Sequence, residues 1–467
     1  MKPEPATRRE RIWLLVILAA ALALRLWVWP DRWINPDEGA HLMDGRLALH
    51  GLVPLVDFSS RQVVYTYLLA GLIWIVGPDF ALVRLGVVLV STLSVWLVYL
   101  LARRLFGGRT GLAAAGVYAM VPLAVIWAPI VHIEPFSIAI SCIALLAVVR
   151  HLEHGGWRPL AAAGLLLGIA FYVRETSLAA MLAALVALAV ASLTGRGGAG
   201  GQSFVRRAAT LVSGFVVPVA VLGALYSSHM TPKMWWHSAL NPLALVLKHT
   251  GKISRALGAA SPVNAAETIR RGEQPWEKTL SYIHEVTLLN AALFVGILIS
   301  LALLARAVRR GGGELERVRV PFALLYAWVG GLGLIYGYWS VYRGFFPQYA
   351  EEFLPGLSIL LGFVLVEIAA GWPSIGHRFG RALIALAVFA AVVFVAERTV
   401  PSFDIPNWAY FVGAAVVLAW WYLPASRRTR GLLGAAAVAL ASTILIAAPG
   451  SPHAAVALGK TLAIPAV

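Results

Sequence analysis

The sequence predicts an all-α polytopic membrane protein with about 13 transmembrane helices, each needing about 20 apolar residues. Two observations predict this class. Hydrophobic residues make up 60% of the 467 residues and charged residues only 13%, whereas a soluble domain is about half apolar and a quarter charged. Apolar runs of bilayer length also recur from one end of the chain to the other. The whole chain, 1–467, is expected to form a single transmembrane domain.

The apolar runs give the expected spans in chain order. The first, Ile12–Trp29, contains Arg25 near its outer end, and we expect this side chain to extend to the interface. The next run, Val63–Val76, is short and is expected to lie at the membrane interface rather than to span. The remaining spans are expected at Leu82–Leu101, Gly111–Ile130, Pro135–Val149, Leu160–Val173, Ser177–Leu193, Ala208–Tyr226, Tyr282–Ala305, Val320–Trp339, Phe353–Ala370, Ala382–Ala396, Trp408–Leu423 and Leu432–Ala448.

Basic residues predict the orientation. More than half of the 38 Lys and Arg residues fall in the N-terminus and in the connections on the same side of the membrane, and such a side faces the cytoplasm. Segments 30–81 and 227–281 then lie outside, the first as a candidate catalytic loop with interfacial helices and the second as a long loop that shapes a cavity. The formal charge of +16 is explained by this topology without nucleic-acid binding. The expected location is a bacterial-type inner (plasma) membrane, with the N-terminus in the cytoplasm and the functional site on the outer face.

The segment Asn35–Arg61 gathers charged residues in a chain that otherwise avoids them. Its opening letters, N-P-D-E, predict a helix with Asn35 as N-cap, acids in the first turn and an end near Gly51. A carboxylate held in a definite direction at a helix N-terminus can also act as a general base. Asp37 is therefore a candidate catalytic base, with Glu38 as its neighbour.

Other charged residues are expected at the same outer face. Glu134 precedes a proline at a helix start, so it either caps that helix or orients a basic partner or a substrate. Arginine matches the geometry of phosphate oxygens, which makes Arg61 and Arg174 candidate phosphate ligands. The alternatives are that Arg61 reaches the headgroups and that Arg174 pairs with Glu175. Further residues that could contact a substrate there are His41, His132, His237, Arg343, Tyr349 and Glu351.

Several function classes lack their motifs. The sequence contains no HExxH, no P-loop and no GxSxG, so zincin, nucleotide-hydrolase and serine-hydrolase chemistry are not indicated. The single cysteine, Cys142, lies in an apolar run and excludes an intramolecular disulfide and a cysteine-based metal cluster.

The motifs of the N-terminal part resemble a known family. The succession N-P-D-E-G-A-H after the first span, then G-L-V-P-L-V-D-F-S-S-R and L-I-W-I-V-G-P-D-F-A-L-V-R-L, is similar to the GT-C-fold glycosyltransferases. More narrowly, it resembles the branch that includes protein O-mannosyltransferases and the aminoarabinose transferase of lipid A. The likeness covers Ile12–Arg196 well, including Ile133–Phe136 and Val173–Glu175. It covers the later half loosely, near Tyr349–Pro355.

The resemblance implies a GT-C-like bundle, a sugar on a polyprenyl phosphate as donor, and a hydroxyl acceptor on a lipid, glycan or protein. It implies Asp37 as base or acceptor-orienting group, Glu38 as support, Glu134 as second acid, and Arg61 and Arg174 as ligands of the donor phosphate. Two departures stand out. This chain has Arg61-Gln62 where the family often has Lys-Pro, and it has Glu134 where the family usually has Asp. The branch implies no cofactor, although a divalent metal stays open.

The residues alone also favour a reaction type. One base and no evident nucleophile favour a single displacement with inversion, and cations can neutralise a phosphate leaving group. A transporter or flippase of a lipid-linked or anionic substrate is one alternative, but it would place charges near mid-span. An enzyme like the O-antigen ligases or polymerases is another, with its chemistry in 227–281. A scaffold without activity is the third.

Overall fold

The computed structural model describes residues 5–29, 35–60, 62–195, 203–237, 240–241, 293, 296–343 and 347–370. Among these residues there are helices, turns and one isolated β-bridge, but no strand. The chain divides into two compact units, Met1–Val364 and Leu365–Val467. The described residues lie almost entirely in the first unit, to which the following paragraphs refer. The chain is thus an all-α protein over the part that the structure describes.

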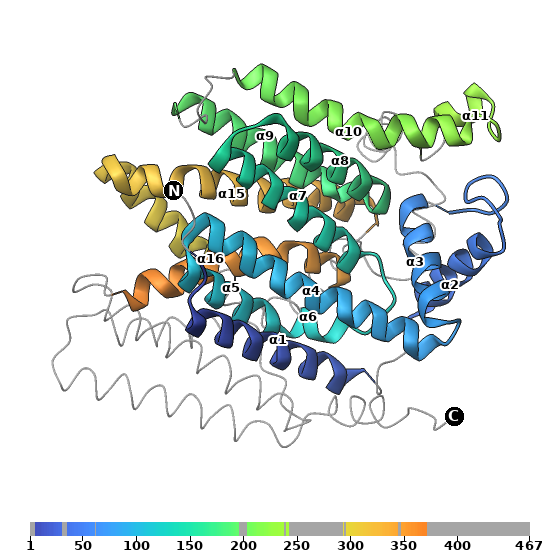
Figure 1. The fold of residues 1–467 in the computed structure, drawn as a ribbon, viewed down its shortest axis with the longest axis horizontal. Coiled ribbons are helices and arrows are strands. Elements are labelled where there is room, and N and C mark those ends of the chain that lie inside the picture. Colours follow the sequence, from blue (N-terminus) through green and yellow to red (C-terminus); the bar gives the residue numbers. More distant parts are fainter. Residues whose placement is uncertain are drawn as a thin grey trace. The chain divides into compact units, whose positions relative to one another are not determined.

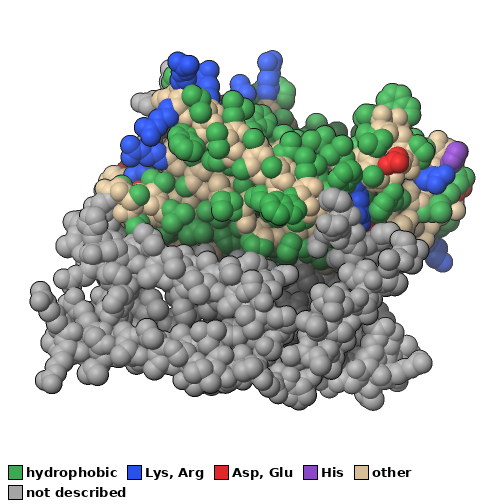
Figure 2. Space-filling view, turned by 90° about the horizontal axis from the view of Figure 1, so that it is seen from below, with side chains coloured by type: hydrophobic (Ala, Val, Ile, Leu, Met, Phe, Trp, Pro, Cys, Tyr) green, Lys and Arg blue, Asp and Glu red, His purple; other side chains and the backbone are tan. Residues whose placement is uncertain are grey.

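Seven helical segments within the described residues are long and apolar enough to cross a membrane. Together with the composition, they make the chain a polytopic integral membrane protein. Figure 2 shows a face on which hydrophobic side chains cover most of the described surface, while Lys and Arg gather mainly at one end. The segments are α1 (Arg8–Val28), α4 (Phe80–Phe106), α7 (Glu134–His154), Glu175–Leu193 with α9 (Leu178–Leu193), α10 (Phe204–Tyr226), Gly312–Gly337 within α15 (Gly312–Arg343), and Gln348–Ala369 with α16 (Leu354–Ala369).

Shorter helices connect these spans (Figure 1), and the 3-10 helices η1 and η3 form the first turns of two of the spans. The connecting helices include α3, whose bounds match the expected short helix, and α8, which matches the expected partner of α9. The expected spans beyond residue 370 and most of Tyr282–Ala305 lie outside the described residues, and 296–310 is helical. The shorter helices are α2 (Pro36–Leu49), α3 (Val63–Val76), α5 (Gly108–Met120), α6 (Pro122–Trp127), α8 (Trp157–Val173), η1 (Glu175–Ser177), α11 (Pro232–His237) and η3 (Pro347–Phe353).

The expectation of one continuous helix over Gly111–Ile130 is wrong. Helix α5 ends before Val121, whose backbone is non-helical (φ −59°, ψ 119°), and α6 begins at Pro122. A proline has no N–H to donate and disfavours helical backbone at the residue before it. After α6 the chain runs through 128–133 to α7, and this non-helical stretch supplies part of the cavity described below.

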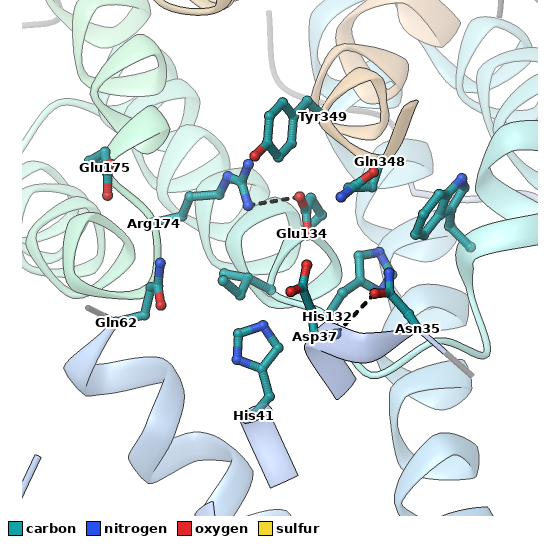
Figure 3. Close-up of a pocket in the computed structure, with 12 residues that line it drawn as sticks. Asn35, Asp37, His41, Gln62, His132, Glu134, Arg174, Glu175, Gln348 and Tyr349 are labelled. Carbon is teal, nitrogen blue, oxygen red and sulfur yellow. Dashed lines mark hydrogen bonds and ion pairs between the residues drawn. The ribbon is translucent and has the colours of Figure 1, made fainter. Parts of the chain in front are cut away.

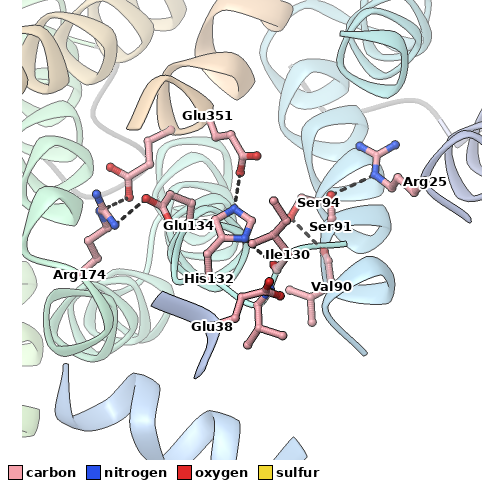
Figure 4. A network of polar contacts seen from close by, with 12 residues as sticks. Arg25, Glu38, Val90, Ser91, Ser94, Ile130, His132, Glu134, Arg174 and Glu351 are labelled. Carbon is pink, nitrogen blue, oxygen red and sulfur yellow. Dashed lines mark hydrogen bonds and ion pairs between the residues drawn. The ribbon is translucent and has the colours of Figure 1, made fainter. Parts of the chain in front are cut away.

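Arg25 joins three helices instead of extending to the interface, so that expectation is also wrong. Its exposed fraction is 0%. Its Nε donates to Ser91 Oγ of α4 at 3.0 Å (Figure 4). Its Nη1 donates to the carbonyl oxygens of Ala21 and Ala119 at 3.1 and 3.3 Å. These bonds satisfy Nε and Nη1 of a charged group in the apolar bundle, where a charge without hydrogen bonds would be costly.

Helices α8 and α10 pack backbone against backbone. A Cβ atom added at Gly164 would overlap the carbonyl oxygen of Leu211, and one at Gly214 would overlap the carbonyl oxygen of Ala161. Small residues allow such an approach in membranes, where close packing drives helix association. This packing fixes the end of α8, and therefore the position of Arg174 directly after it.

Candidate active site

A cavity of about 270 Å³ lies where α2, the 128–133 connection, the start of α7, the α8–α9 junction and η3 meet (Figure 3). It collects residues from five separate parts of the sequence. Six of the residues expected from the sequence to function at the outer face are among those that line it. The lining residues are Asn35, Asp37, His41, Gln62, Trp127, His132, Ile133, Glu134, Arg174, Glu175, Gln348 and Tyr349.

Helix α2 begins with a capping box, as its sequence predicts. The Asn35 side chain accepts from the Asp37 N–H at 3.0 Å, and the Glu38 carboxylate accepts from the Asn35 N–H at 2.9 Å. The helix ends at Leu49, and Gly51 follows with a φ of +83°, a conformation that favours glycine. The acids at the start of α2 are thereby held in definite directions.

Glu38 points away from the cavity and anchors α2. In addition to the Asn35 N–H, its carboxylate accepts from Arg84 Nε at 2.9 Å, Arg84 Nη2 at 2.6 Å and the Val131 N–H at 2.7 Å. Glu38 is 0% exposed, and the Arg84 guanidinium lies 4.4 Å from the centre of the Phe80 ring. Glu38 thus ties α2 to α4 and to the 128–133 connection. With four donors on one carboxylate, its role is structural.

Asp37, one residue earlier, points into the cavity (Figure 3). Its side chain is exposed, and its carboxylate has no hydrogen bond to any residue that the structure describes. It stands in the first turn of α2, where the positive end of the helix dipole favours an anion. Of Asp37, Glu38 and Glu134, Asp37 is the carboxylate left open to a substrate.

Arg174 is the centre of a buried charged cluster. Helix α8 ends before it, and its extended backbone (φ −158°, ψ 127°) directs it between helices. Its Nη1 lies 2.7 Å from Glu134 Oε1, its Nε 3.4 Å from Glu352 Oε1, and its Nη2 donates to the Tyr336 hydroxyl at 3.1 Å. The Tyr336 hydroxyl donates in turn to Glu352 at 2.7 Å, and the guanidinium lies 4.9 Å from the Tyr349 ring centre.

The cluster keeps Arg174 charged. Burial opposes the charge, but Glu134 and then the other neighbours raise the pKa of Arg174 well above its ordinary value. The sequence suggested Glu175 as its partner, whereas the structure brings in Glu134 from α7 and Glu352 from η3. Two carboxylates around one guanidinium leave this cluster without net positive charge. Arg174 still lines the cavity and can direct its remaining N–H groups there.

His132 is held on both ring nitrogens. Its Nδ1 lies 2.6 Å from the Ile130 carbonyl oxygen and its Nε2 3.0 Å from Glu351 Oε2 (Figure 4). Burial disfavours the charged ring, but the Glu351 carboxylate more than compensates and raises the pKa of His132 to about 9. At neutral pH the ring is therefore an imidazolium paired with the Glu351 carboxylate, with neither nitrogen free to bind a substrate.

His41 also lines the cavity, one helical turn after Asp37. Its ring meets the Tyr65 ring edge-on, with centroids 5.0 Å apart. Burial lowers the pKa of His41 below its ordinary 6.5, and the Asp37 and Glu134 carboxylates oppose that shift only in part. This imidazole is therefore neutral at neutral pH.

The remaining expected residues are placed as follows. Glu351 lies behind His132 and does not line the cavity. Arg61 lies outside the described residues, and His237 and Arg343 lie in described helices without described side chains. Sequence reasoning missed Arg84, Tyr336 and Glu352, whose partners are far away in the chain. A signal existed for Arg84, an arginine within an apolar run. Among the described residues no group of three His, Cys, Asp or Glu side chains could hold a metal ion.

The helix bundle that holds this polar cavity has a GT-C-like fold, as two comparisons with known proteins indicate. A family model described as dolichyl-phosphate-mannose-protein mannosyltransferase matches residues 60–233. The solved structure of ArnT from Cupriavidus metallidurans bound to undecaprenyl phosphate matches with a TM-score of 0.57 and 18% identity, and its apo state with 0.52 and 17%. Each alignment covers 96% of this chain and 75% of the ArnT chain. No protein of curated function matches the sequence. The family model over residues 60–233 and the similar fold thus agree with the resemblance noted in the sequence.

Proposed function

We propose that the protein transfers a sugar from a polyprenyl phosphate to a hydroxyl acceptor by a single displacement that inverts the anomeric centre. The observation that carries the proposal is the cavity, where the Asp37 carboxylate, without a hydrogen bond to any described residue, faces the Arg174 guanidinium and the His132 ring. Such a cavity can hold an acceptor hydroxyl on one side and an anionic leaving group on the other. The match to an ArnT structure bound to undecaprenyl phosphate supports a polyprenyl phosphate as donor.

The donor phosphate requires more positive charge than the described residues provide. Arg174 is neutralised by Glu134 and Glu352, and His132 by Glu351. Gln62 lines the cavity, and Arg61 directly precedes it in the sequence. Arg61 is therefore proposed as the main ligand of the donor phosphate, with Arg174 as the second. No metal or cofactor is included in the proposal.

The site is proposed to face the outside of the inner membrane, with the N-terminus in the cytoplasm. Arg84 near the start of α4 contacts the Glu38 anchor beside the cavity. Arg103 near the end of α4 pairs with Glu10 at the start of α1 at 2.8 Å. At 1.5 Å per residue these two arginines lie about 28 Å apart along the helix, close to the hydrocarbon thickness. This separation supports a placement of the basic N-terminal end and the cavity on opposite sides of the membrane, with the basic side toward the cytoplasm.

The proposal is tested with purified protein in liposomes that contain a polyprenyl-phosphate sugar and a hydroxyl acceptor. Asp37→Asn should lower transfer about a thousandfold, within the range that an assisted proton transfer contributes, and leave donor binding unchanged. Arg61→Ala should weaken donor binding. The sugar and acceptor to supply are identified by mass spectrometry of lipids, glycans and cell-wall polymers from a deletion strain. Movement of the intact donor across the bilayer, without any transfer product, would instead indicate a flippase.

A further inference from the structure

Four groups that line the cavity could accept a proton, and two of them are already engaged. Glu134 is paired with Arg174 at 2.7 Å. His132 has an acceptor against each ring nitrogen, the Ile130 carbonyl and Glu351. Asp37 and His41 have no hydrogen bond to any residue that the structure describes. Both lie on the same helix, α2.

Asp37 and His41 are four residues apart, which places them on one face of α2 with their Cβ atoms about 5–6 Å apart. Both side chains point toward the cavity in Figure 3. The edge-on contact with Tyr65 orients the His41 ring, and Tyr65 is held in turn against Phe136 with ring centroids 5.6 Å apart. The two side chains are thus placed as a carboxylate–imidazole pair whose polar atoms are open to a substrate.

We propose that His41 is the general base that takes the proton of the acceptor hydroxyl, and that Asp37 stabilises the imidazolium that forms. This proposal rests on the proposed glycosyl transfer and assigns its proton acceptor. Asp37 stands at the positive end of the α2 dipole, a position that suits a carboxylate that remains an anion. A carboxylate beside a histidine base is a recurrent arrangement for holding the imidazolium formed during reaction.

The charges around His41 suit this role. Burial and the cations His132 and Arg174 lower the pKa of His41, whereas Asp37 and Glu134 raise it by a smaller amount. The ring is therefore unprotonated at neutral pH, and a general base is most effective when its pKa lies near the working pH. The described groups that act on His41 thus leave one ring nitrogen ready to accept a proton.

The step balances without a further reactant. The acceptor oxygen forms a bond to the anomeric carbon as the bond from that carbon to the phosphate oxygen breaks. The leaving lipid phosphate keeps the electron pair of that bond. The hydroxyl proton moves to the free ring nitrogen of His41, and the resulting imidazolium faces Asp37 until it gives the proton to water.

The test compares His41→Gln and His41→Ala with the wild type in the liposome assay, over a range of pH. His50→Ala is the matched control, because His50 is an exposed histidine at the end of the same helix. Both His41 variants should bind the donor as the wild type does and lose about a hundredfold to a thousandfold in kcat. Added imidazole should restore part of the activity of His41→Ala, and the control should behave like the wild type.

The wild-type pH profile gives a readout that does not depend on any variant. The activity of the wild type should fall at acid pH as a group with a pKa below 6.5 becomes protonated. In Asp37→Asn, the same fall in the residual activity should occur at lower pH, because the carboxylate that supports the imidazolium is gone. A wild type without such a fall, or a His41→Gln variant with normal kcat and profile, overturns the proposal. Asp37 would then be the base, and glycosyl transfer would stand. Absence of any transfer by the wild type would overturn the proposed function itself.

Discussion

The two walls of the cavity differ in how their polar groups are used. On the wall formed by the 128–133 connection, α7, Arg174 and η3, the charged groups are paired: Arg174 with Glu134 and Glu352, and His132 with Glu351. On the wall formed by α2, Asp37 and His41 lack hydrogen bonds to described residues. Paired buried charges are costly to disturb, whereas unpaired ones are available to a substrate. The first wall is therefore a framework, and the second carries the proton chemistry.

The same contrast separates two neighbouring residues. Glu38 is fully buried under four donors, while Asp37 is exposed to the cavity. Successive residues on a helix differ by about 100° in direction, so one acid can face the bundle while the other faces a substrate. Two adjacent carboxylates thus separate into an anchor and a reactive group.

Loss of Arg174 should have the largest effect on stability. Arg174→Ala leaves Glu134 and Glu352 buried without their cation, which costs about 3–5 kcal/mol. Thermal unfolding in detergent should show a large fall in the midpoint, together with loss of transfer. Arg174→Lys keeps the charge but not the planar fork, so its loss should be smaller. An Arg174→Ala variant as stable as the wild type would contradict the framework role of this wall.

Loss of the Glu38 charge should have the next largest effect. Glu38→Gln keeps the shape but removes the carboxylate charge that faces the buried Arg84 guanidinium, and we expect a destabilisation of about 3 kcal/mol. Asp37→Asn is the matched control one residue away, and it should unfold like the wild type while losing transfer. In Glu38→Gln combined with Arg84→Met, the two losses should not add. Additive losses, or an equally unstable Asp37→Asn, would remove the distinction between anchor and reactive group.

The sequence was sufficient to predict those features that depend on residues adjacent in the chain. The start of α2 at Asn35 and the bounds of Val63–Val76 follow from capping and from the length of an apolar run, and the structure agrees with both. Pro122 was a local signal too, but the apolar run across it concealed the break between α5 and α6. The sequence also placed Asp37, Glu134 and Arg174 at one membrane edge, and they line one cavity.

The pairings could not be predicted from the sequence. His132 and Glu351 are 219 residues apart, and Arg174 and Tyr336 are 162 apart. Which charges meet depends on how the helices pack, and a single sequence does not specify that packing. For the same reason Arg25 was expected at the interface, although Ser91 of α4 and a carbonyl of α5 hold it inside.

The smallest of these effects is a dependence of stability on pH that comes from His132. Its pKa is about 9 in the folded protein against an ordinary 6.5, because Glu351 outweighs burial. Because folding raises this pKa, protonated His132 stabilises the folded protein fully below about pH 6.5, and this stabilisation is lost as pH rises through about 9. Between about pH 7 and pH 9.5 the free energy of unfolding should therefore fall by about 2 kcal/mol, which thermal unfolding over a pH series would detect.

Glu351→Gln should unfold at a lower temperature at pH 7 and lose most of this dependence. Parallel pH curves for the two proteins would mean that His132 is not an imidazolium, and the framework wall would then lack one of its two cations.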